Sequence, residues 1–338
     1  MQTYINKVIT GQNLTRAEAA DAMDKMLGGG ATEAQSAALL TALRMKGETI
    51  EEIAGCAEKM KEKASHIKPK TRGFVDCVGT GGDGTSTFNI STTAAFVIAG
   101  AGVPIAKHGN RAISSRAGSA DLLEALGVNI MLEPEGVERC VDEIGIGFMF
   151  AKTFNKSMKD ISKVRSEIKT RTIFNILGPI SNPSNAPYQM IGVFSPTLVN
   201  PLANAMKEMG IKHGMVVSAL ENGMDEISVS GETAVSEITS DGVKDYVIAP
   251  EQFGIERSPK EAVAGGNAEE NVRYTLDILN GQKGAKRDIV VLNAGAAIYS
   301  ACCAKTIAEG VEMANEAIDS GRAMQKLEDL KRLSNEVR

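Results

Sequence analysis

The sequence contains no tryptophan, and aromatic residues make up only 4% of its 338 residues. This scarcity disfavours the stacking platforms that bind single-stranded nucleic acid. A net charge of −5 gives no basic field for nucleic acid or for an anionic membrane. No apolar stretch reaches the length of a membrane span, and residues 1–12 lack the apolar core of a signal peptide. We therefore expect a cytoplasmic protein that binds neither nucleic acid nor membranes.

The cysteines do not form a pattern typical of a metal site or a disulfide framework. Cys302 and Cys303 are adjacent, and no two cysteines are separated by two residues. Adjacent cysteines cannot easily share one disulfide bond or one metal ion. The expected state of all five cysteines, which also include Cys56, Cys77 and Cys140, is a buried free thiol.

The first seventy residues contain only helix patterns. The run AALLTALRMKG places Leu39, Leu40 and Leu43 at helical spacing. Three pairs match the capping box, in which threonine stands three residues before Glu or Gln: Thr15 with Glu18, Thr32 with Gln35, and Thr49 with Glu52. These signals predict a small helical domain over residues 1–70.

Beyond residue 70, short apolar runs alternate with helix patterns. The sequence predicts a helix at residues 91–102, an ordered loop or hinge at 174–187, and helices over the last 40 residues. Strands are predicted at residues 74–78, 103–109, 215–220, 226–230 and 289–295. This alternation indicates an α/β fold over residues 71–338, with a mostly parallel central sheet covered by helices. Ligands of such sheets bind beyond the carboxyl ends of the strands.

A glycine-rich loop, GTGGDG at residues 79–84, follows the first predicted strand. It matches the G-x-G-x-x-G pattern of dinucleotide-binding folds, which makes a nicotinamide-dependent oxidoreductase an alternative. Against that alternative, Lys107 and His108 stand where such folds carry an acid. Short hydroxyl and amide side chains crowd the start of the next helix: Thr85, Ser86, Thr87, Asn89, Ser91 and Thr92. A helix N-terminus with free N–H groups and hydroxyls is a ready site for phosphate.

A second anion-binding element follows the next predicted strand. Basic and amide side chains are interleaved there with Ser114, Ser115 and Ser119: Lys107, His108, Asn110, Arg111 and Arg116. In a chain of net charge −5, such a cluster is not expected as a random solvated surface. Positive charge, many donors and a glycine-containing backbone are what a polyphosphate requires.

Two adjacent acids, Asp225 and Glu226, stand in the glycine-containing segment ENGMDE. Side by side in a regular strand they would point to opposite faces, but in a loop both can reach one cation. One or two carboxylates with substrate phosphates is the usual arrangement around magnesium. A solvated surface pair is the alternative, and the two predicted phosphate sites favour magnesium.

Together these motifs resemble those of anthranilate phosphoribosyltransferases. GTGGDG followed by STFNIST, KHGNRAISSRAGSADLLEALG, RTIFNILGP with a following NP, and MDE occur in that order. The segments KHG and GSADLLEALG are also similar to pyrimidine nucleoside phosphorylases. The resemblance implies an enzyme of tryptophan biosynthesis, a glycosyltransferase that moves the phosphoribosyl group of phosphoribosyl pyrophosphate (PRPP) to the amine of anthranilate. Pyrophosphate is the other product.

The resemblance also implies an architecture and a set of site residues. The helical domain would be completed by a segment near residues 155–185 and would form a homodimer, and association with anthranilate synthase components stays open. Mg²⁺, as two ions, would be held by Ser91, Asp225 and Glu226. Anthranilate would contact Gly79, Asn110 and Arg165, with Arg165 meeting its carboxylate. PRPP would be held by Gly79, Gly82, Asp83, Thr87, Asn89, Ile90, Ser91, Thr92, Lys107, His108, Gly109, Asn110, Arg111, Ala112, Ile113, Ser114, Ser115 and Ser119.

One segment departs from the family pattern. Where the family usually carries a histidine before a methionine, this chain has Phe154-Asn155-Lys156-Ser157-Met158. That region lines the aromatic-acid entrance in the family, so transfer to another aromatic acceptor is an alternative. A pyrimidine nucleoside phosphorylase and a non-catalytic PRPP-binding protein are two more. An aromatic amine is neutral at pH 7, so we expect no protein nucleophile and no essential base.

Overall fold

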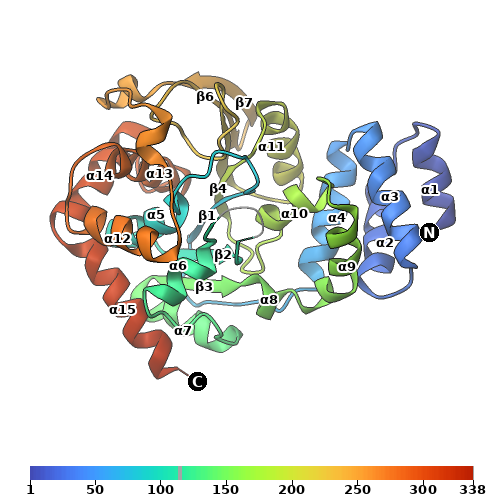
Figure 1. Cartoon of the computed structure of the whole chain (residues 1–338), viewed down its shortest axis with the longest axis horizontal. Helices are drawn as coiled ribbons and strands as arrows, with labels where there is room; N and C mark the ends of the chain where they lie inside the picture. Colours follow the sequence, from blue (N-terminus) through green and yellow to red (C-terminus); the bar gives the residue numbers. More distant parts are fainter. Residues whose placement is uncertain (113–115, 338) are drawn as a thin grey trace.

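The computed structural model describes residues 1–112 and 116–337. A bundle of helices at the N-terminus lies at one end of the molecule, and the α/β domain occupies the rest (Figure 1). The hydroxyls of Thr15, Thr32 and Thr49 each accept from a backbone N–H three residues on, and the side chain at that position accepts in return. The three predicted capping boxes are confirmed. The bundle helices are α1 (Gln2–Ile9), α2 (Arg16–Leu27), α3 (Glu33–Lys46) and α4 (Ile50–Glu62).

Seven strands of the described chain form one sheet in the order β3-β2-β1-β4-β5-β6-β7. The first five strands in this order are parallel, and β6 and β7 add antiparallel pairs at one edge. The prediction of a mostly parallel sheet is confirmed. The bounds are β1 (Val75–Gly79), β2 (Ile105–Gly109), β3 (Ile146–Phe150), β4 (Tyr188–Gly192), β5 (His213–Ala219), β6 (Thr233–Thr239) and β7 (Gly242–Ile248).

Two hydrophobic cores lie on opposite faces of the sheet. Met190 and Met215 belong to the core beneath α5 and α13, whereas their neighbours Ile191 and Val216 belong to the other. This alternation follows because successive strand residues point to opposite faces. Figure 1 shows the C-terminal helices on one side of the sheet and the N-terminal bundle on the other. Helices of the first core include α5 (Ile90–Gly100), α6 (Ser119–Ala125), α7 (Pro134–Ile144), α12 (Ala268–Leu279), α13 (Ala285–Ser300), α14 (Ile307–Asp319) and α15 (Arg322–Glu336).

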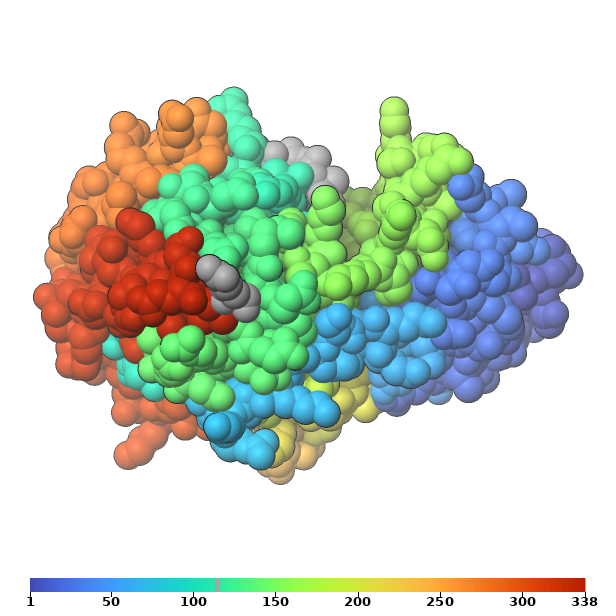
Figure 2. Space-filling view, turned by 90° about the horizontal axis from the view of Figure 1, so that it is seen from below, coloured from blue at the N-terminus to red at the C-terminus, as the bar shows by residue number. Residues whose placement is uncertain are grey.

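The second core is continuous from the sheet into the N-terminal bundle. Helix α11 packs against β5, β6 and α4, helix α10 against α4, and helix α9 against α2 and α3. Leu40, Leu177 and Leu202, from the bundle, α10 and α11, are buried in the same cluster. Figure 2 shows the α9 segment resting on the blue N-terminal helices. The α-helices between β3 and β5 in the chain are α8 (Ala151–Phe154), α9 (Lys159–Ile168), α10 (Phe174–Ile180) and α11 (Val199–Glu208).

Two predicted strands are wrong. Residues 289–295 lie inside α13, whose Ile289, Val290 and Leu292 are all fully buried. An apolar run buried on every side carries no polar face to distinguish a helix from a strand. Residues 226–230 form an irregular loop, in which Ile227 N donates to Asn293 Oδ1 at 2.9 Å. The Asn293 side chain thus accepts the hydrogen bond that a neighbouring strand would accept in a sheet.

Two further expectations need correction. The segment 174–187 is not a loop throughout, because its first half forms α10, with Pro179 inside the helix. All five cysteines are free, as expected, but Cys302 and Cys303 are exposed rather than buried. Over the described residues, no helix combines the length and the apolar character that crossing a membrane requires.

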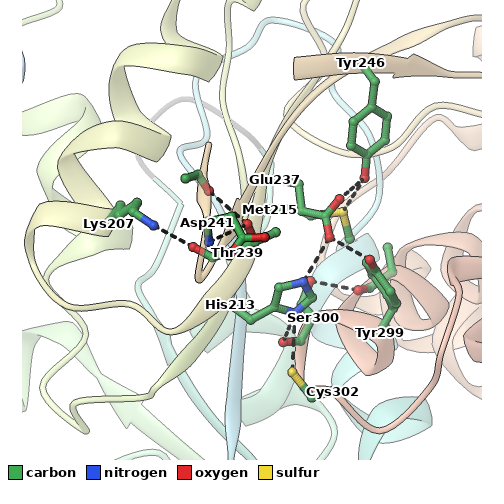
Figure 3. A network of polar contacts seen from close by, with 12 residues as sticks. Lys207, His213, Met215, Glu237, Thr239, Asp241, Tyr246, Tyr299, Ser300 and Cys302 are labelled. Carbon is green, nitrogen blue, oxygen red and sulfur yellow. Dashed lines mark hydrogen bonds and ion pairs between the residues drawn. The ribbon is translucent and has the colours of Figure 1, made fainter. Parts of the chain in front are cut away.

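A polar network at the amino end of β5 connects the antiparallel strands to α13 by hydrogen bonds (Figure 3). Glu237 of β6 accepts from Tyr299 at 2.6 Å and Tyr246 at 3.1 Å, and its Oε1 lies 2.9 Å from His213 Nε2. His213 is the first residue of β5, so this network lies at the opposite end of the sheet from the carboxyl ends of the parallel strands. It therefore stabilises the fold and is remote from the predicted site.

The His213–Glu237 pair predicts a pH window for stability. The hydrogen bond with Glu237 raises the pKa of His213 above its ordinary 6.5, and that with His213 lowers the pKa of Glu237 below its ordinary 4.5. The contribution of Glu237 is lost as pH falls through its lowered pKa, and that of His213 is lost as pH rises through its raised pKa. We expect His213→Gln to lower the melting temperature most between about pH 4.5 and 6.5. A melting-temperature difference that is independent of pH from 4 to 9 would contradict the assignment.

Candidate active site

The site is built where β1 and β4 end, on Gly79 and Gly192, beneath the loop that carries the acid pair. A Cβ atom on Gly79 would lie 2.3 Å from Asp225 Oδ2, and one on Gly192 would lie 1.6 Å from the Asp225 carbonyl oxygen. Any larger side chain would push the acidic loop away. The two glycines therefore let the loop rest directly on the strand ends.

The glycine loop turns toward this pair. Gly81, Gly82 and Gly84 have φ values of 67°, 69° and 79°, in the left-handed region that glycine adopts most easily. The backbone N–H of Gly81 donates to Asp225 Oδ2 at 2.6 Å. Asp83, at the far side of the loop, accepts from the backbone N–H of Asp225 at 3.4 Å. Residues 144 positions apart in the chain thus form one polar site.

The two acids are almost completely buried. Asp225 is 8% exposed and Glu226 is 7% exposed. Burial raises the pKa of both carboxyls, and the negative charge of Asp83 adds to the rise for Asp225, as that of Asp225 does for Glu226. The ammonium of Lys107 acts in the opposite direction on Glu226. Acids held close together in a buried place are stabilised in their charged form by a cation between them.

Lys107 is the buried cation of the site, at 2% exposure. Its Nζ donates to the Cys77 carbonyl and to Ser91 Oγ, the latter at 3.2 Å. The backbone N–H of Ser91, in the first turn of α5, donates to Glu226 Oε1 at 3.2 Å. Lysine is almost never buried without partners. This one ammonium therefore joins β1 to the start of α5, and the Ser91 N–H joins α5 to the acid pair.

Amide and hydroxyl side chains fix the start of α5 against its neighbours. Asn89 Nδ2 donates to the Ala117 carbonyl at 3.1 Å, and its Oδ1 accepts from Asn271 at 2.9 Å. Thr92 Oγ1 donates to Ser119 Oγ at 2.9 Å. The N-terminus of α5 is therefore preorganised, with its first backbone N–H groups facing the carboxyl edge of the sheet.

Other residues implied by the resemblance are placed differently. Arg111 pairs with Asp121 and Glu124 at 2.9 and 2.8 Å, so its guanidinium is engaged within the protein. The Ile90 side chain is 1% exposed in the first core, which leaves only its backbone to contribute. Asn110 is exposed, and its Oδ1 accepts from the Arg111 N–H. Gly82 lies in the glycine loop, and Thr87 lies between that loop and α5. Gly109 is the last residue of β2, Ala112 lies beyond it, and Ile113, Ser114 and Ser115 lie outside the described residues.

Arg165 lies on α9, on the side of the molecule that faces the bundle. Its guanidinium stacks over the Phe174 ring at 5.1 Å. Burial lowers the pKa of Arg165, and no acid among residues 1–112 and 116–337 opposes that shift. A half-buried, unpaired arginine stacked on an aromatic ring is well suited to receive a carboxylate.

Sequence reasoning missed three residues beside the glycine loop. Arg171 donates to the Gly82 carbonyl and stacks over Phe194 at 4.2 Å. Lys260 and Glu261 line a cavity of about 260 Å³ together with Asp83 of the loop and with Thr85 and Thr87, which follow it. Arg171 opens the RTIFNILGP motif and could have been singled out, but no local pattern marks Lys260 or Glu261.

The donor set fits a magnesium ion that is shared with a substrate. In the described part of the chain, no group of three or more His, Cys, Asp or Glu side chains could hold a metal ion by itself. Mg²⁺ does not need such a cage, since it is bound through one or two carboxylates plus substrate phosphates and waters. The two buried carboxylates with raised pKa values, next to a helix N-terminus, are the arrangement this requires.

Comparison with known proteins places these features in a family. Residues 2–64 match the glycosyl transferase family helical bundle domain, and residues 71–324 match the glycosyl transferase family a/b domain. Anthranilate phosphoribosyltransferase from Acetivibrio thermocellus is 51% identical over 99% of this chain and 97% of its own length. That from Symbiobacterium thermophilum is 50% identical over 100% and 99%. The chain belongs to the anthranilate phosphoribosyltransferase family.

Solved structures of anthranilate phosphoribosyltransferases have the same fold. The enzyme from Thermus thermophilus superposes with a TM-score of 0.93 at 42% identity, over 98% of this chain and 99% of that one. The Saccharomyces cerevisiae enzyme in complex with PRPP and Mg gives a TM-score of 0.90 at 27% identity, over 99% and 98%. The same enzyme in complex with 4-fluoroanthranilate gives 0.89 at 26% identity, again over 99% and 98%. The family and the two-part fold expected from the motifs are confirmed.

Proposed function

We propose that this chain transfers the phosphoribosyl group of PRPP to the amine of anthranilate, releasing pyrophosphate, as a step of tryptophan biosynthesis in the cytoplasm. The observation that carries the proposal is the buried pair Asp225–Glu226, held against the glycine loop and the start of α5. The complex of the yeast relative with PRPP and Mg supports PRPP and Mg²⁺ here, and its complex with 4-fluoroanthranilate supports an anthranilate acceptor.

The anion-binding residues take complementary parts in this proposal. The glycine loop and the N-terminus of α5 bind phosphate through backbone N–H groups, with hydroxyls of Ser91 and Thr92 beside them. Lys107 places a buried positive charge at the same point. Asp225 and Glu226, with Ser91, would hold Mg²⁺ as two ions. When bound, Mg²⁺ would neutralise charge on the pyrophosphate and orient it.

The chemistry needs orientation and electrostatic stabilisation rather than a protein base. The neutral aromatic amine attacks C1 of the ribose, the bond from C1 to pyrophosphate breaks, and the configuration at C1 inverts. The nitrogen then gives up one proton to water. Negative charge then grows on pyrophosphate, where Lys107 and the loop N–H groups stabilise it. Holding the amine against C1 supplies the rest of the rate acceleration. No described residue has to act as a nucleophile.

Arg165→Ala tests the acceptor side. We expect the KM for anthranilate to rise about 10- to 100-fold, since a charge-assisted hydrogen bond is lost, with kcat changed less than about threefold. Lys163→Ala is the matched control, because Lys163 lies on the same helix, is exposed and pairs with Glu33 at 2.8 Å. Steady-state kinetics with saturating PRPP give both values. An unchanged KM for anthranilate in Arg165→Ala would show that Arg165 does not bind the acceptor.

The function itself is tested by pyrophosphate release from PRPP, with and without magnesium and anthranilate. Release that requires both supports the proposal. Binding of PRPP without release in the presence of anthranilate would indicate another aromatic acceptor or a binding-only protein. Phosphate-dependent cleavage of pyrimidine nucleosides would indicate a phosphorylase instead.

We also propose that residues 1–70 and 155–185 act as one domain that forms a homodimer. Met45 and Ile9 of the bundle are 84% and 64% exposed, which leaves apolar surface uncovered in a single chain. Light scattering after size-exclusion chromatography measures the mass. A monomer at micromolar concentration would contradict the proposal.

A further inference from the structure

Asn155 is a buried polar residue with an unusual set of partners. It follows α8 directly beyond the carboxyl end of β3 and is 5% exposed. Its Nδ2 lies 3.1 Å from His108 Nε2, and its Oδ1 has no hydrogen-bond partner. A structural asparagine normally satisfies both ends of its amide. Here only the donor end has a partner among the described residues, so the contact with His108 fixes the side chain.

The contact determines which ring nitrogen of His108 carries the proton. Burial lowers the pKa of His108 to about 4, so the ring is neutral and has a single N–H. The NH₂ group of Asn155 can only donate, which makes Nε2 the acceptor and leaves the proton on Nδ1. The backbone of Gly178 lies beside the ring and raises the pKa of His108, in the direction opposite to burial.

The His108 ring therefore joins three segments. His108 lies near the end of β2, just before Gly109 and Asn110 on the phosphate side of the site. Gly178 lies in α10, and Asn155 lies in the segment that leads to α9 and Arg165. The ring thus links the phosphate side of the site to the segment that leads into the helix carrying Arg165.

We propose that Asn155 is a positioning residue for the acceptor: by donating to His108 Nε2 it holds the imidazole in the Nδ1–H tautomer and so aligns α9 with the end of β2. This inference rests on the proposed function for its kinetic consequence, but the tautomer itself does not. Asn155 acts through His108, and no contact of its own with a substrate is required.

The charged groups around His108 do not stabilise a second proton on its imidazole. Lys107 precedes His108 and disfavours a charged imidazole. Asp76 of β1 accepts from the backbone N–H of His108 at 3.4 Å. Lys152 and Lys156, the charged side chains on either side of Asn155, are exposed, and α10 carries no charged residue. Asn155 is the described side chain that determines the state of Nε2.

Long-range ¹H–¹⁵N NMR of the imidazoles tests the tautomer, and it is practical because the chain has only three histidines. Loss of one signal in His108→Gln assigns His108. We expect Nδ1 protonated, Nε2 unprotonated, and no titration between about pH 5 and 9 in the wild type. In Asn155→Asp a carboxylate replaces the donor, so we expect His108 to begin to titrate within this range. A wild-type ring protonated on Nε2 would overturn the proposal.

Kinetics separate positioning from mere support of the fold. Asn155→Ala is expected to lower kcat/KM for anthranilate about tenfold, with the KM for PRPP changed less than about twofold. Thr153→Val is the control, since it removes a buried, unpartnered polar group, the Thr153 hydroxyl, from the same segment. An Asn155→Ala enzyme with unchanged tautomer and unchanged acceptor kinetics would overturn the inference. A wild type that is inactive with anthranilate would instead contradict the proposed function, and the NMR result would still stand.

Discussion

Replacing Asp225 by Asn and Glu226 by Gln in one protein is expected to lower magnesium-dependent turnover by at least about a thousandfold. Both carboxylates are buried, and the backbone N–H groups of Gly81 and Ser91 hold them in place. The amides keep the shape of the side chains but remove the two negative charges that attract the cation. Turnover at saturating PRPP, measured across a magnesium titration, gives the effect.

The matched control for the double variant is Glu221→Gln. Glu221 lies in the same loop, but it is exposed and its carboxylate lies against Gly231. We expect its turnover to stay within about twofold of the wild type, as for most exposed substitutions. Unchanged magnesium-dependent turnover in the double variant would show that the metal is held elsewhere.

Gly192→Ala is the second change for which we expect a large effect. The added Cβ would lie 1.6 Å from the Asp225 carbonyl oxygen, which is a backbone atom that cannot rotate away. The acidic loop must therefore move off the end of β4, and the carboxylates move with it. We expect turnover to fall at least about a hundredfold, and the free energy of unfolding to fall by about 3 kcal/mol. Kinetics and chemical denaturation measure the two effects.

Gly30→Ala serves as the control for Gly192→Ala. Its Cβ would meet no atom closer than 3.5 Å, and its backbone does not lie in the left-handed region. Both turnover and stability should remain close to those of the wild type. If Gly192→Ala behaved like Gly30→Ala, the contact between the acidic loop and the strand end would not matter for activity.

Local patterns predicted the elements that are determined locally. A capping box involves residues three positions apart, so Thr15, Thr32 and Thr49 marked their helices correctly. The apolar runs at β1, β2 and β5 are bounded by glycines or polar residues and were also recognised. Helix α13 was missed because tertiary packing buries residues 289–295 on all sides. The loop at 226–230 was missed because Asn293, 66 positions away, bonds the backbone of Ile227 in place of a neighbouring strand.

The residue types of the candidate site could be predicted from the sequence, but the contacts between its distant segments could not. Glycines followed by hydroxyls, and then a lysine after a strand, indicate phosphate binding on their own. The contact of Asp225 with Gly81 and the contact of Asn155 with His108 depend on how the strands are ordered in the sheet. Neither Lys260 nor Glu261 carries any local signal, because the cavity beside them exists only after folding.

The core shared by the bundle and the sheet has a consequence for unfolding. Family models divide the chain between residues 64 and 71, yet Leu40, Leu177 and Val216 belong to one buried cluster that crosses this division. Removing either part would expose the apolar surface of the other. The two segments are therefore expected to lose structure cooperatively, so that the boundary visible in the sequence is not a boundary of stability.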